Sequence, residues 1–472
     1  MHAREQLYID GKWIDSLGKG SIDVINPATE EIIGRVPVGS TKDVDKAVVA
    51  AKSAFDSWSK SSVEERIELL NALSNAFKER GEELAQTITS EVGTPIGYSR
   101  VAMVGTPRVV SRSYAKILED YVWEKEIRNS IICKEPIGVC AFITPWNFPL
   151  HQIIGKVAPA IAAGCTMILK PSKEAPLSAF ILAEILDEIG LPAGVFNLVS
   201  GHGSEVGDYM SSHPDVDMVS FTGSTGAGVS VSQSAAPTIK RVTLELGGKS
   251  ANVALEDADP VLVAKKAIGA CHQNSGQTCS ALTRLIIPES MNKQVCDIIA
   301  EKNDSYLVGN PLDEETRCGP MVSLRQQLSV TEYIQSGIDE GANLISGGLG
   351  MPDGIEKGFY VKPTIFANVT PEMKIWKEEI FGPVLVITTY NTESEALKLA
   401  NDSIYGLSGG VWSKDPDRAV NFAKKMRTGQ VSVNGGSFNV SAPFGGYKLS
   451  GNGRELGTHG LDEFLEIKSI QL

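Results

Sequence analysis

The feature that most constrains this chain is an alternation of short apolar runs with longer amphipathic stretches. Helical spacing of apolar residues predicts helices over 63–85, 178–189, 264–272, 324–340 and 393–401. Apolar, β-rich runs predict strands at 139–143, 167–169, 195–199, 218–222, 242–246, 252–255 and 284–287, and a last buried strand at 431–434. Strands that alternate with helices indicate parallel βαβ units. Since the pattern breaks near residues 247–248, we expect an α/β fold with two consecutive α/β regions.

Size and charge narrow the class of protein. With 472 residues, 42% of them hydrophobic, the chain has enough apolar mass for two or three domains. A formal net charge of -13 argues against a nucleic-acid partner, because a phosphate-binding surface needs a basic excess. The longest apolar stretch, 157–169, is shorter than the about 20 residues that span a bilayer, and the N-terminus lacks the pattern of a signal peptide. We therefore predict a soluble, cytoplasmic protein without a membrane partner.

The cysteines and histidines also exclude some chemistries. Seven cysteines at irregular spacing, without a CxxC pair, argue against a disulfide framework and favour a reducing compartment. The six histidines include no pair at i, i+4, which excludes an HExxH zinc helix. We predict no metal site.

One cysteine lies in a segment that a substrate could reach. Cys279 ends the run Asn274-Ser-Gly-Gln-Thr-Cys279 and is followed by Ser280, which makes a small, polar, glycine-containing turn. A nucleophilic thiol needs such access, whereas a structural thiol is usually buried on an apolar face. The local sequence does not decide between these two interpretations for Cys279. Cys271 lies on the helical pattern just before it, and we interpret it as a core residue.

Two further stretches place polar groups at strand ends. In Phe142-Ile-Thr-Pro-Trp-Asn147, the Asn147 amide could donate to an oxyanion, although an ordinary turn asparagine is the alternative. In Val242-Thr-Leu-Glu245, partial burial would raise the pKa of the carboxyl and make it a usable general base. The alternative for Glu245 is a strand-edge glutamate that faces water.

Three more stretches have features of a cofactor site. Phe221-Thr-Gly223-Ser224-Thr-Gly226 leads from a strand into a helix, where backbone N–H groups favour a phosphate, but its GxxGxG spacing departs from the GxGxxG fingerprint. Lys170 follows a strand and could contact a ribose or a phosphate there, although a solvated lysine is the alternative. Glu378-Glu379-Ile-Phe381 places a carboxylate pair beside an aromatic ring.

Together and in this order, these motifs resemble the aldehyde dehydrogenase superfamily of NAD(P)-dependent, non-acylating oxidoreductases. The resemblance extends from Asn26-Pro-Ala-Thr-Glu30 to Pro443-Phe-Gly-Gly-Tyr-Lys448 and Gly453-Arg-Glu455. It implies a Rossmann-like NAD(P)-binding domain at 1–118 and 138–247, and a catalytic domain at 248–443. It also implies a small β oligomerisation flap with the tail, at 119–137 and 444–472. Members of this family are homodimers or homotetramers, and we expect the same here.

The resemblance implies a reaction and its catalytic residues. Cys279 would attack the aldehyde carbon, and the Asn147 amide with the Cys279 backbone N–H would hold the oxyanion. Hydride transfer to NAD or NADP would leave a thioester, which water activated by Glu245 would hydrolyse to the acid. Lys156 and Glu455 match positions of a proton relay in relatives.

The resemblance also assigns cofactor and substrate residues. The expected cofactor-binding residues are Ile143, Thr144, Pro145, Trp146, Lys170, Ser172, Lys173, Gly203, Gly207, Phe221, Gly223, Ser224, Leu246, Gly247, Glu379 and Phe381. The expected substrate residues are Phe148, Gln152, Thr278, Ser280, Phe438 and Phe444. Because no arginine flanks Cys279, as one does in relatives that use acidic semialdehydes, we infer a neutral, moderately apolar aldehyde.

One departure from the family bears on cofactor choice. Many NAD-preferring relatives have a glutamate three residues after the family lysine, whereas this chain has Lys173. A cation cannot accept hydrogen bonds from the ribose but can attract a 2′-phosphate. We therefore predict that NADP is accepted and NAD stays usable, with the preference between them open. The alternative is that Lys173 points to solvent and Glu174 takes the ribose.

Three other functions compete with this prediction. An acylating dehydrogenase would pass the thioester to coenzyme A and would not need Glu245. A thiol hydrolase would need a histidine beside Cys279, and His272 is the histidine nearby in sequence. A non-enzymatic binding or structural protein would leave the Cys279, Glu245 and Asn147 set unexplained.

Overall fold

The larger of the two main sheets has eight strands. The computed structural model describes residues 2–472. In spatial order this sheet contains β20 (Gly451–Asn452), β12 (Arg241–Glu245), β11 (Met218–Thr222), β8 (Val139–Ile143), β9 (Thr166–Lys170), β10 (Phe196–Leu198), β2 (Gln6–Ile9) and β3 (Lys12–Asp15). The five strands from β12 to β10 are parallel, so their carboxyl ends meet at one edge. Strand β20 pairs with β12 antiparallel, opposite Glu245.

Helices cover both faces of this sheet. Side chains that alternate along β8 enter two different cores: Phe142 faces one, and Ala141 and Ile143 face the other. The first core is closed by α2 (Val63–Glu79), α3 (Gly81–Val92), α5 (Thr106–Glu119), α6 (Pro149–Ala163) and α7 (Leu177–Glu188). The second is closed by α1 (Thr41–Trp58), α8 (Asp208–Ser212) and α9 (Thr225–Ala235). Burial on both faces explains why these strands are continuous apolar runs.

A second sheet repeats this arrangement. Its order is β15 (Asn343–Ser346), β16 (Thr364–Ala367), β17 (Val384–Tyr390), β14 (Arg284–Pro288), β13 (Ala251–Ala254), β18 (Gly409–Trp412) and β19 (Ser432–Val433), and all neighbours except β15 and β16 are parallel. One face packs against α10 (Pro260–His272) and α11 (Asn292–Asp304). The other packs against α12 (Leu324–Asp339), α13 (Lys374–Lys377), α14 (Glu393–Asn401) and α15 (Pro416–Ala423). The two sheets confirm the predicted α/β fold class.

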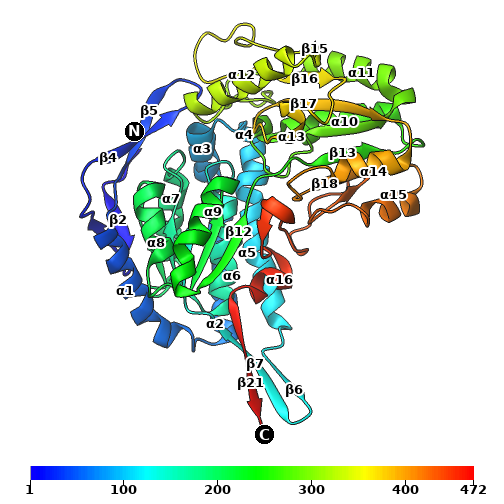
Figure 1. Cartoon of the computed structure of the whole chain (residues 1–472). Coiled ribbons are helices and arrows are strands. Elements are labelled where there is room, and N and C mark those ends of the chain that lie inside the picture. The colour runs from blue at the N-terminus through cyan, green and yellow to red at the C-terminus, as the bar shows by residue number, and fades with distance from the viewer. Residues whose placement is uncertain (1) are drawn as a thin grey trace.

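Two small sheets complete the chain. Strands β1 (His2–Ala3), β5 (Glu31–Pro37) and β4 (Ser21–Asn26) form one of them. Strands β21 (Leu465–Gln471), β7 (Ser130–Pro136) and β6 (Glu124–Ile127) form the other, which projects from the body of the molecule in Figure 1. The short helices α4 (Ile96–Tyr98) and α16 (Gly457–Asp462) lie between larger elements. No helix within residues 2–472 has the length and apolar character to cross a membrane.

Two predicted elements were wrong. Residues 63–85 are not one helix, because α2 ends at Glu79 and α3 begins at Gly81, with Arg80 out of helical conformation between them. Residues 431–434 are not a last buried strand: β19 is half-buried at the sheet edge, and β20 and β21 follow it. Asn434 and Gly435 both have positive φ, which ends the extended backbone there. The proposed division into three domains stays a prediction.

Candidate active site

A cavity of about 430 Å³ lies where the carboxyl ends of the first sheet face loops of the second region. After β8 it is lined by Pro145, Trp146 and Asn147, and after β11 by Thr222, Gly223 and Ser224. Glu245, Leu246 and Gly247 follow from the end of β12. The second region contributes Cys279, Val322, Ser323, Arg325, Gln326, Ser329, Glu379 and Phe381, and Glu174 also lines the cavity. The Cys279, Asn147, Glu245 and Glu379 motifs therefore meet in one place.

Cys279 lies in a tight turn after α10. Asn274 and Ser275 have φ values of 50° and 56°, and the Gln277 N–H donates to the Asn274 carbonyl at 3.0 Å. This turn directs the partly exposed Cys279 into the cavity. Burial, followed by the carboxylates of Glu379 and Glu245, raises the pKa of the Cys279 thiol far above its ordinary value. The thiol therefore needs a base before it can attack.

Asn147 is buried beside this turn. Its Nδ2 donates to the Gln277 carbonyl at 3.0 Å, which uses one of the two amide protons. The other proton is left for an acceptor in the cavity. The hydrogen bond joins the loop after β8 to the cysteine turn.

Sequence reasoning missed the residues that support Asn147. Asn274 donates from Nδ2 to the Asn147 carbonyl at 2.9 Å and to the Gln277 carbonyl at 3.3 Å. Thr94 in turn donates to the Asn274 side-chain oxygen at 2.7 Å. A polar Asn-Ser-Gly run suited to positive φ was the one available signal for Asn274, and nothing in sequence pointed to Thr94.

Glu245 is a buried carboxylate without hydrogen-bond partners. Neither of its oxygens accepts a hydrogen bond from a residue within 2–472. Burial, followed by the nearby charge of Glu455, raises the pKa of the Glu245 carboxyl well above its ordinary value. Gly445 approaches so closely that a Cβ there would lie 2.7 Å from Oε1 of Glu245. This desolvated carboxylate has the environment of a general base and not of a solvated strand edge.

Lys156 and Glu455 form an ion pair close to Glu245. The fully buried Lys156 on α6 donates to Glu455 and to the Thr222 hydroxyl, the latter at 2.8 Å. Glu455 raises and Lys156 lowers the pKa of the Glu245 carboxyl. The three charges are therefore coupled, as a proton relay requires.

Several predicted cofactor residues meet at one end of the cavity. Ser224 caps α9, accepting from the Ala227 N–H at 3.4 Å, and the free N–H groups at this helix start suit a phosphate. The Trp146 and Phe381 rings make an edge-to-face contact with centroids 5.4 Å apart. The Gly223 N–H donates to the Glu245 carbonyl at 3.0 Å, and this hydrogen bond joins the turn after β11 to the end of β12.

Glu379 is held against the loop after β12. Its Oε1 accepts from the Gly248 N–H at 2.9 Å, and a Cβ on Gly247 would lie 2.1 Å from Oε2. Gly247 thus permits the close approach that a side chain would block. Burial raises the pKa of the Glu379 carboxyl to about 7, and Gly248 and Lys249 oppose that rise.

Lys170 and the residues after it lie at the carboxyl end of β9. Lys170 is buried at the end of β9, donates to the Pro171 carbonyl at 2.7 Å and packs against Gly207. Burial lowers the pKa of Lys170 to about 8. Lys173 is half-exposed and lies 3.6 Å from the Glu174 carboxylate. Glu174, and not Lys173, is among the residues that line the cavity.

Other predicted cofactor residues are not among those that line the cavity. Ile143 and Phe221 are buried at the ends of β8 and β11, and the Oγ1 of Thr144 has no partner within residues 2–472. Ser172 accepts from the Glu174 N–H at 3.2 Å. Gly203 is exposed at the start of a short π-helical segment that ends at Gly207.

Three of the six predicted substrate residues lie in an aromatic wall that begins at Phe148, next to Asn147 in sequence. Phe148, His151, Phe438 and Phe444 follow one another in edge-to-face contacts with centroids 6.0 to 6.4 Å apart. His151 was missed in the sequence, and burial lowers its pKa to about 4, so it is neutral. Gln152 is buried with its Oε1 unpartnered in the described chain. Thr278 donates to the Gln273 carbonyl at 3.3 Å, and Ser280 is half-buried.

The histidine required by a thiol hydrolase is absent from the described cavity lining. His272 is fully buried, its Nε2 bonds the Asn303 side chain at 2.9 Å, and its ring packs on Tyr306. Burial lowers the pKa of His272 to about 4. Cys271 lies on α10 and is buried in the hydrophobic core, as predicted. The described cavity lining therefore offers the Glu245 carboxylate, and no imidazole, in the same cavity as Cys279.

Comparisons with known proteins agree with this geometry. The model of the aldehyde dehydrogenase family matches residues 13–470. A 3-succinoylsemialdehyde-pyridine dehydrogenase from a Pseudomonas species is 49% identical, covering 100% of this chain and 99% of its own. The crystal structure of a cysteine-to-alanine mutant of aldehyde dehydrogenase C from Pseudomonas syringae, with NAD+ and octanal, has a TM-score of 0.98 and 48% identity, covering 99% of this chain and 96% of that one.

A third relative supports the same conclusion. The structure of a Mycobacterium tuberculosis aldehyde dehydrogenase complexed with NAD+ has a TM-score of 0.97 and 40% identity, covering 100% of this chain and 98% of that one. The similarity therefore extends over the whole chain, including both sheets. The chain belongs to the aldehyde dehydrogenase family.

Proposed function

We propose that this protein oxidises an aldehyde to a carboxylic acid with NAD+, through a thioester on Cys279. The observation that carries the proposal is that the Cys279 thiol, the Asn147 amide and the Glu245 carboxylate line one cavity, with Glu379 on the same wall. The state of each group suits its proposed role. The Cys279 thiol requires a base, the Asn147 amide has a second proton to donate, and the Glu245 carboxylate is desolvated.

Groups at the carboxyl ends of the first sheet suit a dinucleotide. The start of α9 with Ser224 would hold the pyrophosphate, and Lys170 would contact the adenosine ribose. The Glu379 carboxylate would accept from the hydroxyls of the nicotinamide ribose, beside Phe381. NAD+, when bound, supplies the acceptor for the hydride that leaves the substrate adduct, which becomes a thioester on Cys279.

Attack by Cys279 needs proton removal and charge stabilisation. Glu245 would take the thiol proton, since burial raises the pKa of its carboxyl and so makes its carboxylate a stronger base. The thiolate would then form a bond to the aldehyde carbon, and the carbonyl oxygen would become an oxyanion. The second amide proton of Asn147 and the backbone N–H of Cys279 would donate to that oxyanion.

Hydrolysis of the thioester returns the enzyme to its starting state. The proton taken from Cys279 would first pass from Glu245 toward the Lys156–Glu455 pair, which frees the carboxylate. Glu245 would then remove a proton from water, whose oxygen attacks the acyl carbon; the C–S bond breaks, and the departing Cys279 thiolate takes that proton back from Glu245 as the acid is released. This water-activating role of Glu245 favours the hydrolytic enzyme over an acylating dehydrogenase.

The substrate would be a neutral, moderately apolar aldehyde. The aromatic wall of Phe148, Phe438 and Phe444, with neutral His151, offers apolar contact and no charge. A mutant of a related enzyme was crystallised with octanal, and another relative is named for 3-succinoylsemialdehyde-pyridine; such a wall would accept both aldehydes. Thr278 and Ser280 complete the surroundings of Cys279.

NAD+ would be favoured over NADP+. Glu174 lines the cavity, whereas Lys173 is half-exposed and paired with it. A carboxylate accepts hydrogen bonds from ribose hydroxyls and repels a 2′-phosphate. This arrangement supports the alternative that the sequence left open, in which Glu174 takes the role that Lys173 cannot play.

The protein would act as a homodimer or homotetramer. The β6–β7–β21 sheet exposes Ile127, Ile467 and Leu472, and its outer strands have unpaired edges in the described chain. Exposed apolar side chains on an open sheet edge favour pairing with a second copy. Light scattering of the purified protein measures this state directly.

The test of the main proposal is formation of reduced nicotinamide, followed by ultraviolet absorbance. A panel of aliphatic, aromatic and acidic aldehydes is assayed with NAD+ and with NADP+, in the wild type and in Cys279→Ala. The proposal expects acid formation by the wild type and none by the variant. No reduction with any aldehyde would refute it, and a requirement for coenzyme A would favour the acylating reaction.

A further inference from the structure

A glutamine at the start of α12 reaches out of its own helix. Gln326 is the third residue of α12, and Ser323 caps this helix start by accepting from the Gln326 N–H at 3.4 Å. A glutamine at this position can fold back onto the backbone N–H of the capping residue. Here its Nε2 donates instead to the Phe381 carbonyl at 2.9 Å and to the Ile380 carbonyl at 3.4 Å. Gln326 thus joins α12 to the turn at 379–382, and both line the cavity.

The turn that Gln326 holds has a strained backbone. Phe381 has a φ of 57°, in the left-handed region that bulky side chains rarely adopt. Such a conformation persists only where the surroundings impose it, and it is commonest at ligand sites. The Phe381 ring packs edge-to-face on the Trp146 ring, with centroids 5.4 Å apart, and both residues line the cavity. The hydrogen bond from Gln326 to the Phe381 carbonyl therefore stabilises the conformation that places this ring on the cavity wall.

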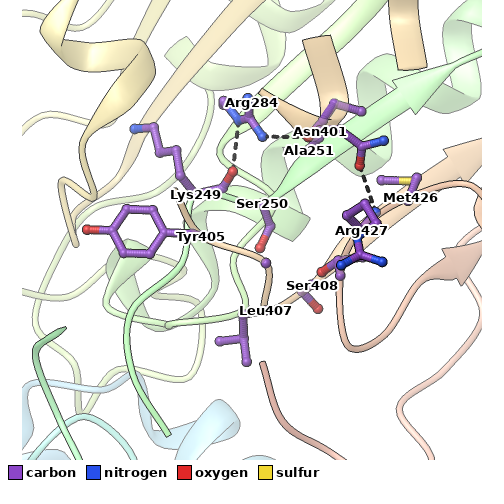
Figure 2. Close-up of a pocket in the computed structure, with 13 residues that line it drawn as sticks. Lys249, Ser250, Ala251, Arg284, Asn401, Tyr405, Leu407, Ser408, Met426 and Arg427 are labelled. Atoms are coloured by element: carbon purple, nitrogen blue, oxygen red, sulfur yellow. Dashed lines mark hydrogen bonds between the residues drawn. The ribbon is translucent and has the colours of Figure 1, made fainter. Parts of the chain in front are cut away.

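The 379–382 turn packs against two other parts of the site. On one side, Oε1 of Glu379 accepts from the Gly248 N–H at 2.9 Å. Figure 2 shows how the same loop is anchored, since Nε of Arg284 donates to its next carbonyl at 2.8 Å. On the other side, a Cβ on Gly276 in the cysteine turn would lie 2.1 Å from the Gly382 carbonyl oxygen. The turn therefore lies between the loop after β12 and the turn that carries the thiol, and α12 holds its backbone.

We propose that Gln326 is a positioning residue for the cofactor: its side-chain amide holds the 379–382 turn in the conformation in which Glu379 and Phe381 face the nicotinamide half of NAD+. This inference rests on the proposed function, in which Glu379 accepts from the nicotinamide ribose. Gly248 fixes the carboxylate of Glu379, and Gln326 fixes the backbone two residues further on.

The role predicts a loss of affinity that depends on the ligand. Without the Gln326 amide, the 379–382 turn gains conformational freedom, and a ligand that contacts the turn has to order it on binding. NAD+ contains the nicotinamide ribose and would bear this cost. ADP ends at the pyrophosphate and lacks that ribose, so its affinity should not change. A general loss of structure would weaken both ligands alike.

The experiment measures Kd for NAD+ and for ADP by calorimetric titration, together with steady-state kinetics. Gln326→Met keeps the length of the side chain and removes the donor. Its Kd and KM for NAD+ should rise about fivefold, as expected for one hydrogen bond, while Kd for ADP stays at the wild-type value. KM for the aldehyde should not change, and kcat should change less than KM for NAD+. Gln326→Leu carries the same test if the methionine variant does not fold.

Two further variants test the route of the effect. Glu379→Gln should also weaken NAD+ and not ADP. The Gln326→Met/Glu379→Gln double variant should lose less affinity than the product of the two single losses, because both changes act on one contact. Gln327→Met is the matched control: this next glutamine of α12 donates to the Tyr360 carbonyl at 2.8 Å and is not among the residues that line the cavity. It should keep the wild-type Kd for both ligands.

Each contrary result has a distinct meaning. If Gln326→Met weakens ADP as much as NAD+, or leaves NAD+ affinity unchanged, Gln326 does not position the 379–382 turn and the inference is wrong. A double variant that shows the full product of both losses would mean that the two side chains act independently, which also overturns it. If Glu379→Gln itself binds NAD+ like the wild type, the proposed function of Glu379 fails instead, and a loss in Gln326→Met would act through Phe381 alone.

Discussion

Replacing Asn147 with alanine should separate catalysis from folding. The variant loses the oxyanion donor, which costs about 10²–10³ in kcat, or ~2.7–4 kcal/mol of transition-state stabilisation. It also loses the hydrogen bond from Asn147 to the Gln277 carbonyl at 3.0 Å. That carbonyl still accepts from Asn274 at 3.3 Å, and Asn274 still donates to the Asn147 backbone carbonyl. Since no buried acceptor is orphaned, the loss of stability should be only about 1 kcal/mol.

The assay combines steady-state kinetics with thermal unfolding. Because attack and hydrolysis both pass through an oxyanion, kcat should fall while KM for NAD+ stays near the wild-type value. The matched variant is Asn274→Ala, which leaves the Asn147 amide in place but removes the bonds that hold it. It should lose part of the rate and more of the stability, since Asn274 supports two carbonyls.

Two results would refute this reasoning. An Asn147→Ala variant that raises KM for the aldehyde at unchanged kcat would make Asn147 a substrate-binding residue. A variant that loses rate only in proportion to its folded fraction would show that the amide supports structure alone.

The remaining predictions concern the thiol, the base and the cofactor. Cys279→Ala should lose dehydrogenase activity while binding NAD+ normally in a calorimetric titration; retained turnover would move the nucleophile to another cysteine. Glu245→Gln should slow hydrolysis of the thioester, so that mass spectrometry detects an acyl group on Cys279. Burial disfavours the Glu245 anion, so wild-type activity should rise with pH as that carboxyl deprotonates, and the Gln variant should lose this dependence. Glu174→Gln should shift the ratio of kcat/KM toward NADP+ more than Lys173→Glu shifts it toward NAD+; the reverse order would show that Lys173 faces the ribose.

The sequence predicted elements best where burial was complete. Strands β8 and β11 have the predicted bounds, because a strand covered on both faces is a continuous apolar run. Prediction was wrong for 63–85, where α2 and α3 share a helical pattern that continues across Arg80. The break depends on how the two helices pack, and periodicity carries no information about that. Strand β19 was misjudged because its half-buried position at the sheet edge is set by neighbours far away in sequence.

The sequence predicted the distinctive residues of the candidate site but not the residues that support them. Motifs with distinctive residues, such as those of Cys279 and Glu245, could be chosen and then placed in one cavity by the fold. Their supports could not, because Thr94 bonds Asn274 across 180 residues of chain and Asn274 bonds Asn147 across 127. The position of Glu174 likewise depends on local backbone geometry, which the order Lys173-Glu174 does not determine.

The pairing of β20 with β12 has a consequence for how the protein is made. Strand β12 ends in Glu245 and has β11 on one side, so residues 451–452 supply the neighbour that closes its other side. During synthesis from the N-terminus, β12 and Cys279 leave the ribosome well before residues 451–455 do. Until then the nascent chain exposes an open strand edge, which is prone to pair with other chains. When residues 451–455 join β12, the open edge is covered and Glu455 pairs with Lys156. Both events therefore occur together and late in folding, because they depend on a long-range contact.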